Sequence, residues 1–266
     1  YNLIDTLNNH SNSLNSVLNV DRSLWMHSFN YVLINFDSYI GYSQNYYLYK
    51  GLSNQFQPIL WDLNMSFGAF RLTDATQSYF NGFDIIQAQN MDPLNFINNS
   101  FLSPRPLITN ILSDARHQRM YLAHMKTIIE DRFLSQTYLS RTQYLQNIIS
   151  TYVQNDTNKF YSFNDFTTNL TSQVTLPSSI CPGISQLMDA RGIYLANYWS
   201  GFTQPSIANI QSIPNSNQFF ASDLTITALI QDASYAMLAY RFGENMPFKE
   251  IEMYDDGNHN DGNAND

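Results

Sequence analysis

The chain has 266 residues, of which 44% are hydrophobic and 15% aromatic, while only 13% are charged. This composition predicts a folded protein with a surface of Asn, Ser, Gln and Thr, and it argues against a disordered chain. The formal net charge is −9, and the 13 Lys and Arg residues form no cluster, which argues against a nucleic-acid partner.

The most informative stretch comes early, where Asp37, Asn45 and Asp62 stand among aromatic and apolar neighbours. Asp and Asn are depleted from strands and cores, so such residues are usually structural caps or ligands of a charged group. Asp37 follows an apolar, helix-like run, and taken alone it is equally well explained as an N-cap or turn residue.

A β-hairpin is predicted directly after this acid. Residues 46–49, Tyr-Tyr-Leu-Tyr, form an aromatic run typical of a strand, and residues 56–60 indicate a second strand. Residues 50–54 have the composition of the loop that joins them.

Asn45 opens the first strand of this hairpin and Asp62 follows the second. Because antiparallel pairing brings those two ends together, we expect both side chains at one end of the hairpin, with Asp37 just upstream. Capping does not require such convergence, whereas a hard cation such as Mg²⁺ is held by oxygen ligands of this kind. Phosphoryl transfer uses the same division of labour, with one Asp near the acceptor hydroxyl and an Asn and a second Asp on the metal.

Three motifs carry a family resemblance: Asn-x-Asp at 35–37, Asn-Tyr-Tyr-Leu-Tyr at 45–49 and Trp-Asp-Leu-Asn-x-Ser-Phe-Gly at 61–68. Together they resemble the core of the CotH family, the spore-coat protein H-like atypical protein kinases. The resemblance implies that Asp37 is the catalytic acid, which accepts the proton of the attacking hydroxyl. It also implies that Asp62 binds metal, that Asn45 completes the metal site, and that Mg²⁺ and ATP are the cofactors.

Asn64 departs from the family pattern, which usually has a second acid at this position of the third motif. An amide keeps one neutral oxygen ligand but removes a negative charge, so we expect weaker metal affinity. The predicted metal ligands are therefore Asn45, Asp62 and Asn64. No Gly-x-Gly-x-x-Gly motif occurs in the chain.

The resemblance implies an α+β fold in which residues 1–200 form the mostly helical C-terminal lobe of a kinase-like domain with a short hairpin. A kinase also needs an N-terminal lobe with several strands and a Lys that holds the nucleotide. Only about 36 residues precede Asp37, too few for that lobe. We therefore expect the chain to be an internal piece of a longer protein.

Helical periodicity dominates the rest of this region. Apolar residues at helical spacing predict helices over about 121–133, over 141–153 and after Pro182-Gly183 as far as Leu195. Residues 93–115 contain three prolines among Asn and Ser and indicate an irregular segment. The family resemblance extends, more weakly, to about Trp199.

The amino-acid composition changes after residue 200. Residues 201–217 have the Pro, Ser, Asn and Gln content of a linker. Strand patterns follow at 224–230, 237–242 and 248–254. Residues 218–266 resemble the start of an immunoglobulin-like β-sandwich of the kind found behind catalytic domains in secreted bacterial proteins, cut short because three strands cannot close a sandwich.

Other groups with metal-binding or nucleophilic chemistry have simpler explanations. The Asp, Asn and Gly residues of 255–266 suit a Ca²⁺ loop or a solvated turn, and we favour the turn because the EF-hand Gly and Glu are missing. Cys181 has no Cys partner, so a buried structural thiol is expected. His117 and His124 are seven residues apart, which favours polar helix surface over a metal pair.

Three functional hypotheses therefore remain open. The first is an atypical protein kinase in a secreted or cell-surface multidomain protein, acting on a protein substrate or cell-surface partner. The second is a non-catalytic kinase-like scaffold or adhesive module, which the Asn64 departure favours. A third reading takes Asp37 and Asp62 as a glycosidase acid pair, about 5–9 Å apart. No run of 18 apolar residues occurs, so no transmembrane segment is expected.

Overall fold

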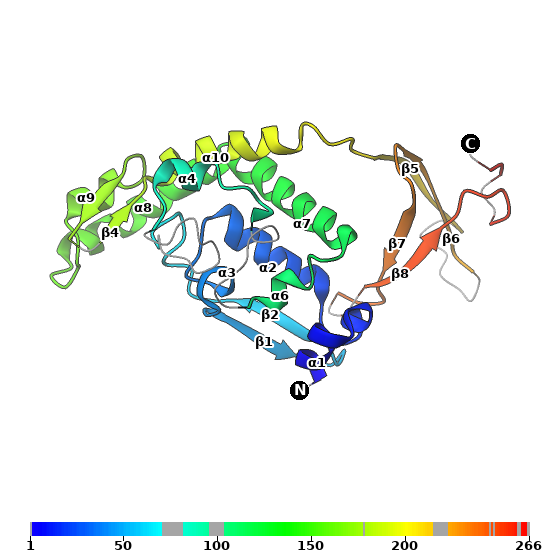
Figure 1. The fold of residues 1–266 in the computed structure, drawn as a ribbon. Coiled ribbons are helices and arrows are strands. Elements are labelled where there is room, and N and C mark those ends of the chain that lie inside the picture. The colour runs from blue at the N-terminus through cyan, green and yellow to red at the C-terminus, as the bar shows by residue number, and fades with distance from the viewer. Residues whose placement is uncertain are drawn as a thin grey trace. The chain divides into compact units, whose positions relative to one another are not determined.

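The computed structural model describes residues 2–70, 82–95, 104–177, 179–214, 223–244, 246, 248–259 and 262–264. The chain divides into two compact units, Tyr1–Trp199 and Ser200–Asp266. The secondary structure of the described residues consists of helices and small two-stranded antiparallel sheets, which agrees with the predicted α+β class (Figure 1). None of the described helices is both long and apolar enough to cross a membrane.

The first unit is built around the helix α2, Val20–Val32, which follows α1, Asn2–Asn9, and a 3₁₀ turn, Ser11–Ser16. The side chain of Asn19 caps α2 by accepting a hydrogen bond from the backbone N–H of Arg22 at 2.9 Å. Nine of the thirteen residues of α2 are buried, so the helix forms the centre of the unit.

The predicted hairpin is confirmed as β1, Tyr46–Lys50, paired with β2, Phe56–Leu60. It begins just after a short helix, α3, Tyr39–Tyr42. Phe56 ties the hairpin to the start of α2, since its N–H donates to Val17 at 2.7 Å and its carbonyl accepts from Asn19 at 2.9 Å. These bonds fix the loop end of the hairpin to the segment before α2. The predicted site residues Asn45 and Asp62 flank the opposite, open end.

The predicted long helices are confirmed as α7, Ala115–Ile128, which continues in a π-helical turn, Ile129–Leu134, as α8, Thr137–Asn155, and as α10, Ile184–Trp199. Shorter elements lie between them: α4, Ile85–Gln89; α6, Pro106–Thr109; α9, Phe163–Thr168; and the hairpin of β3, Val174–Leu176, and β4, Ser179–Cys181. The helix α6 therefore interrupts the segment predicted to be irregular.

A buried arginine joins α10 to the end of α2. The guanidinium of Arg191 donates to the carbonyls of Val32 at 3.0 Å, Tyr31 at 3.1 Å, Ala88 at 3.1 Å and Met91 at 3.2 Å. Burial lowers the pKa of Arg191 to about 10. The carbonyls at a helix C-terminus lack partners inside the helix, and this side chain supplies hydrogen bonds to them. The Tyr31 carbonyl also accepts from the Ile34 N–H at 3.2 Å.

The predicted position of two histidines on a polar helix surface is wrong for His117 and only partly right for His124. His117 is buried, and its Nδ1 shares a hydrogen bond with the Ile111 carbonyl at 3.0 Å. His124 stacks on Trp25 with ring centroids 4.0 Å apart and contacts Asp21 at 2.9 Å. His124 therefore joins α7 to α2, whereas His117 holds the segment just before α7.

The second unit contains two hairpins, β5, Ser206–Ile213, with β6, Thr225–Gln231, and β7, Ala236–Tyr240, with β8, Lys249–Met253. The last three strands match the predicted ones. The strand β5 lies within the segment predicted as a linker, 201–217. Its register shifts between Ala208 and Gln211, where Asn209 has a φ of 51°. The isoleucines of β5 are three residues apart in the sequence, so the alternation typical of a strand is missing there.

The immunoglobulin-like sandwich stays a prediction, since the described strands form two separate two-stranded sheets. In the acidic tail, the exposed Asp256 carboxylate accepts from the Asn258 N–H and shares a hydrogen bond with His259 Nδ1, each at 2.9 Å. These contacts close a turn of the solvated kind that the sequence favoured.

Candidate functional site

The corner between α2 and α3 holds Asp37 in place. The backbone N–H of Asn35 donates to the Asn30 carbonyl at 2.8 Å, and its side-chain amide donates to Asn30 Oδ1 at 2.9 Å. Ser38 Oγ then donates to the Asn35 carbonyl at 2.5 Å. Asn35, Phe36 and Ser38 are all buried, whereas Asp37 is half-buried, so a rigid corner presents this one carboxylate toward the surface.

The helix α3 packs directly on this corner. A Cβ on Gly41 would lie 1.9 Å from the carbonyl oxygen of Phe36, so only glycine fits there. The guanidinium of Arg105 donates to the Gly41 carbonyl, and the hydroxyl of Tyr39 accepts from the Leu107 N–H at 2.9 Å. Burial raises the pKa of Tyr39 to about 12, so this phenol stays neutral.

Two side-chain amides meet the Asp37 carboxylate. Asn45 Nδ2 donates to the Asp37 backbone carbonyl at 2.6 Å and to Asp37 Oδ2 at 3.0 Å. Gln44 Nε2 donates to Asp37 Oδ1. The structure therefore brings Asp37 and Asn45 together, as the hairpin geometry predicted, and adds Gln44, which sequence reasoning missed.

The turn that carries these amides has an unusual backbone. Ser43 ends α3 with a φ of 57°, and Asn45 has a φ of 55°, so two non-glycine residues on either side of Gln44 are left-handed. Each such residue costs about 1 kcal/mol, less for Asn than for most residues. The conformation directs both amides back toward Asp37 while the chain enters β1.

Asp62 and Asn64 lie on the segment that follows β2. Tyr46 pairs with Leu60, so Asp62 comes two residues beyond the end of the hairpin that Asn45 opens. Asp62 is exposed with a φ of 51°, and its carboxylate has no hydrogen bond or ion pair to any residue the structure describes. Asn64 is also exposed.

The end of the third motif returns to the Asp37 corner through the backbone. The N–H of Phe67 donates to the Leu33 carbonyl at 2.7 Å, and the N–H of Gly68 donates to the Ile34 carbonyl at 3.2 Å. Gly68 has a φ of 72°, and a Cβ there would meet Pro182 at 3.3 Å, which explains the glycine of the motif. Residues 67–68 of this motif are thus adjacent to residues 33–34, just before the corner, although no contact joins the side chains of Asp62 or Asn64 to Asp37 in the described structure.

The ligand chemistry at this end of the hairpin is oxygen-based. The described residues contain no group of three or more His, Cys, Asp or Glu side chains placed to hold a metal. The predicted set differs from such a group because two of its three members, Asn45 and Asn64, are amides. Beside it, the exposed rings of Tyr47 and Trp61 contact edge to face with centroids 5.2 Å apart.

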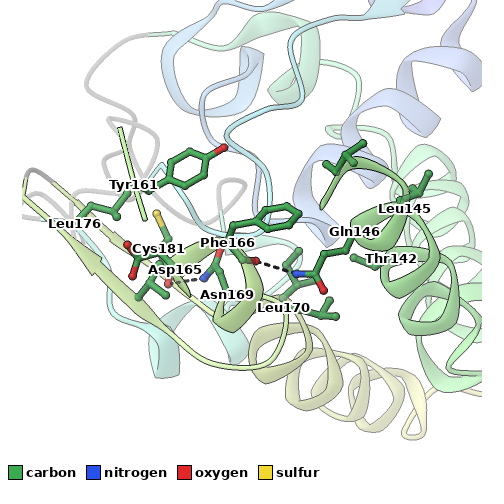
Figure 2. A pocket seen from close by; sticks show the side chains of 13 residues that line it. Thr142, Leu145, Gln146, Tyr161, Asp165, Phe166, Asn169, Leu170, Leu176 and Cys181 are labelled. Atoms are coloured by element: carbon green, nitrogen blue, oxygen red, sulfur yellow. Dashed lines mark hydrogen bonds between the residues drawn. The ribbon is translucent and has the colours of Figure 1, made fainter. Parts of the chain in front are cut away.

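A pocket lies elsewhere in the unit, between α8, α9 and the β3–β4 hairpin. Figure 2 shows this pocket of about 270 Å³, which apolar side chains such as Leu145, Phe166 and Leu170 line. The side-chain amides in its lining form hydrogen bonds with the protein backbone. Gln146 donates to the Phe166 carbonyl at 2.8 Å, and Asn169 donates to the Pro182 carbonyl at 3.0 Å. Cys181 is half-buried in the wall, so its predicted burial is only partial. None of the predicted site residues lines this pocket.

An acid held by two amides, beside a hairpin end with a second exposed acid, defines a candidate oxygen-donor site. A model of the CotH kinase protein family matches residues 1–178. The chain therefore belongs to the CotH kinase protein family, and the predicted resemblance is confirmed. A comparison with curated proteins finds no match. The family match includes the whole candidate site and ends before α10.

Proposed function

We propose that this chain carries the catalytic residues of an atypical protein kinase that transfers the γ-phosphoryl group of ATP to a protein hydroxyl with Mg²⁺. The proposal includes its predicted setting in a secreted or cell-surface protein. The observation that carries it is the orientation of Asn45. Its nitrogen donates to the backbone and carboxylate of Asp37, and this leaves its oxygen to face another group.

The donor set fits a hard cation. Asn45 Oδ1 has no donor among the described residues, and neither does the exposed carboxylate of Asp62. Mg²⁺ is usually held by one or two carboxylates together with substrate phosphates and water. We assign Asp62 and Asn45 to hold it, with Asn64 as a further neutral oxygen. When bound, the ion neutralises charge on the transferring phosphoryl group.

Asp37 serves as the base in this proposal. Each of its oxygens accepts one amide hydrogen bond, and each retains a lone pair that an acceptor hydroxyl can donate to. As the hydroxyl oxygen bonds to the γ-phosphorus, the bond between that phosphorus and the leaving ADP oxygen breaks. The hydroxyl proton passes to Asp37. A positioned base of this kind contributes about 10²–10⁴-fold in rate.

The test is phosphate transfer from labelled ATP by the full-length protein. We expect Asp37→Asn to lose about 10²–10⁴-fold in kcat and Asp62→Ala to lose activity through weaker Mg²⁺ binding. Asp131→Asn is the control, because Asp131 is an acid that is exposed, like Asp62, and lies on the π-helical turn after α7. Equal rates in the wild type, Asp37→Asn and Asp62→Ala would refute the proposal.

A non-catalytic kinase-like module is the second candidate. It is favoured by Asn64, where the family usually has an acid, because the metal half of the site then carries one carboxylate instead of two. Calorimetry with Mg²⁺ and ATP on the full-length protein separates the candidates. Absence of binding selects the scaffold, whereas binding that depends on Asp62 supports the kinase.

A further inference from the structure

We infer that Gln44 is a positioning residue for the Asp37 carboxylate, an inference that rests on the proposed kinase function. Gln44 is exposed and belongs to none of the three motifs that define the family resemblance. Its Nε2 nevertheless donates to Asp37 Oδ1, while Asn45 Nδ2 donates to the opposite oxygen, Oδ2, at 3.0 Å. The two neighbouring amides thus hold the carboxylate from both sides.

Two hydrogen-bond donors fix the orientation of the Asp37 carboxylate, whereas one donor leaves it free to rotate. The final torsion of an Asp side chain joins an sp³ to an sp² carbon, and its energy wells are broad. With Asn45 alone, the carboxylate can rotate about the contact at Oδ2. A second donor at Oδ1 fixes the plane of the group, and with it the direction in which the remaining lone pairs meet a hydroxyl. Because rates fall steeply when reacting atoms are misplaced, this orientation matters for a base.

The chemical type of the two donors also suits a base. No Lys or Arg side chain forms an ion pair with Asp37 in the part of the chain that the structure describes. A cation in that place would stabilise the ionised carboxylate and oppose its uptake of a proton. Neutral amides orient the group with a smaller electrostatic effect. Gln44 therefore supplies direction without adding a full charge.

The position of Gln44 is set by its backbone. The residue follows α3, which Gly41 and Arg105 hold against the Asp37 corner, and it precedes β1. Gln44 is exposed, whereas Asn35, Phe36 and Ser38 of the corner are buried, so its removal should leave the corner intact. We therefore expect substitutions of Gln44 to change the rate of transfer much more than the stability of the fold.

Steady-state kinetics of the full-length protein test this inference with Gln44→Ala and the nearly isosteric Gln44→Glu, which cannot donate when ionised. We expect kcat to fall about tenfold in the alanine variant and at least as far in the glutamate variant, with the KM for ATP within about twofold. Melting temperatures should match the wild type. Gln154→Ala, an exposed glutamine on α8 whose side chain has no hydrogen bond in the described structure, should change nothing.

The outcomes separate the two levels of the proposal. Wild-type kcat in both Gln44 variants, with Asp37→Asn inactive, would overturn the positioning role and leave the kinase function standing. A wild-type rate in Gln44→Glu with a loss only in Gln44→Ala would assign the residue to packing and also overturn the inference. An inactive wild type, or full activity in Asp37→Asn, would remove the kinase function and the positioning role together.

Discussion

Replacing Arg191 by Met should strongly destabilise the first unit. The guanidinium is fully buried and donates to four main-chain carbonyls at 3.0–3.2 Å. Hydrogen bonds from a charged group contribute about 1.5–3 kcal/mol each, but the gain is offset by the cost of burying the charge, which methionine avoids. Since methionine leaves the four carbonyls without this donor, and each buried acceptor left unsatisfied costs about 1–3 kcal/mol, we expect the free energy of unfolding to fall by about 3–5 kcal/mol.

Urea unfolding followed by circular dichroism measures this change, with the slope of the transition checked for two-state behaviour. Arg132→Met is the matched control, because Arg132 is exposed on the π-helical turn and should lose less than about 0.5 kcal/mol. Arg191→Lys should fall between the two, since an ammonium has only three donors and no planar fork to span four carbonyls. A loss below about 1 kcal/mol in Arg191→Met would show that these carbonyls do not depend on the guanidinium.

Two further predictions concern charge. Burial lowers the pKa of His27 from the ordinary 6.5 to about 4. As the pH falls, the unfolded chain therefore binds a proton before the folded chain does. The free energy of unfolding should fall by about 2–3 kcal/mol between pH 7 and 4.5. His27→Gln should flatten that acid limb in pH-dependent unfolding while the exposed His10→Gln does not, and an unchanged limb would contradict the assignment. If the kinase proposal holds, Asn64→Asp should lower the Mg²⁺ concentration for half-maximal transfer several-fold by restoring a carboxylate beside Asp62. Asn54→Asp, in the exposed hairpin loop, should not, and an equal response in both variants would point to general surface charge.

Much of the fold was predictable from local patterns. The hairpin over 46–60 and the helices α7, α8 and α10 follow from strong periodicity and confirm the prediction. The β3–β4 hairpin has only three residues per strand, too few to show a period of two. Its position depends on tertiary contact instead. Gly183 shows this, because a Cβ there would approach the Ser172 backbone nitrogen to 2.5 Å.

Buried polar residues were the least predictable feature. Arg191 occupies one position among apolar residues of a helical pattern, and nothing local distinguishes it from an exposed arginine. Its burial depends on carbonyls contributed by α2 and by residues 88 and 91, distant in sequence. His117 is also buried, and its partner is the nearby Ile111 carbonyl, which lies before the helix and outside its periodic pattern. Such groups are found only when the chain is folded and its backbone acceptors are counted.

At the candidate site, the pairing of Asp37 with Asn45 was predictable and the contribution of Gln44 was not. Antiparallel pairing of β1 with β2 fixes where Asn45 lies, and the helix-like run before Asp37 fixes the approach of the acid. The direction of the Gln44 side chain depends on the left-handed backbone at Ser43 and Asn45. A sequence pattern does not predict this conformation when the residues are not glycine. The catalytic role of Asp37 and the assignment of Asn45, Asp62 and Asn64 to metal stay predictions.

The two halves of the site differ in how firmly the protein holds them, and this difference separates the candidate functions. Asp37 stands on a buried corner and accepts hydrogen bonds on both carboxylate oxygens, whereas Asp62 is exposed and has no such partner in the described structure. A metal ligand that is organised by its ion needs less support from the protein than a base that must be oriented beforehand. A scaffold would need neither arrangement. The amide contacts at Asp37 therefore favour catalysis, and the loss of a carboxylate at position 64 bears on metal affinity rather than on the base.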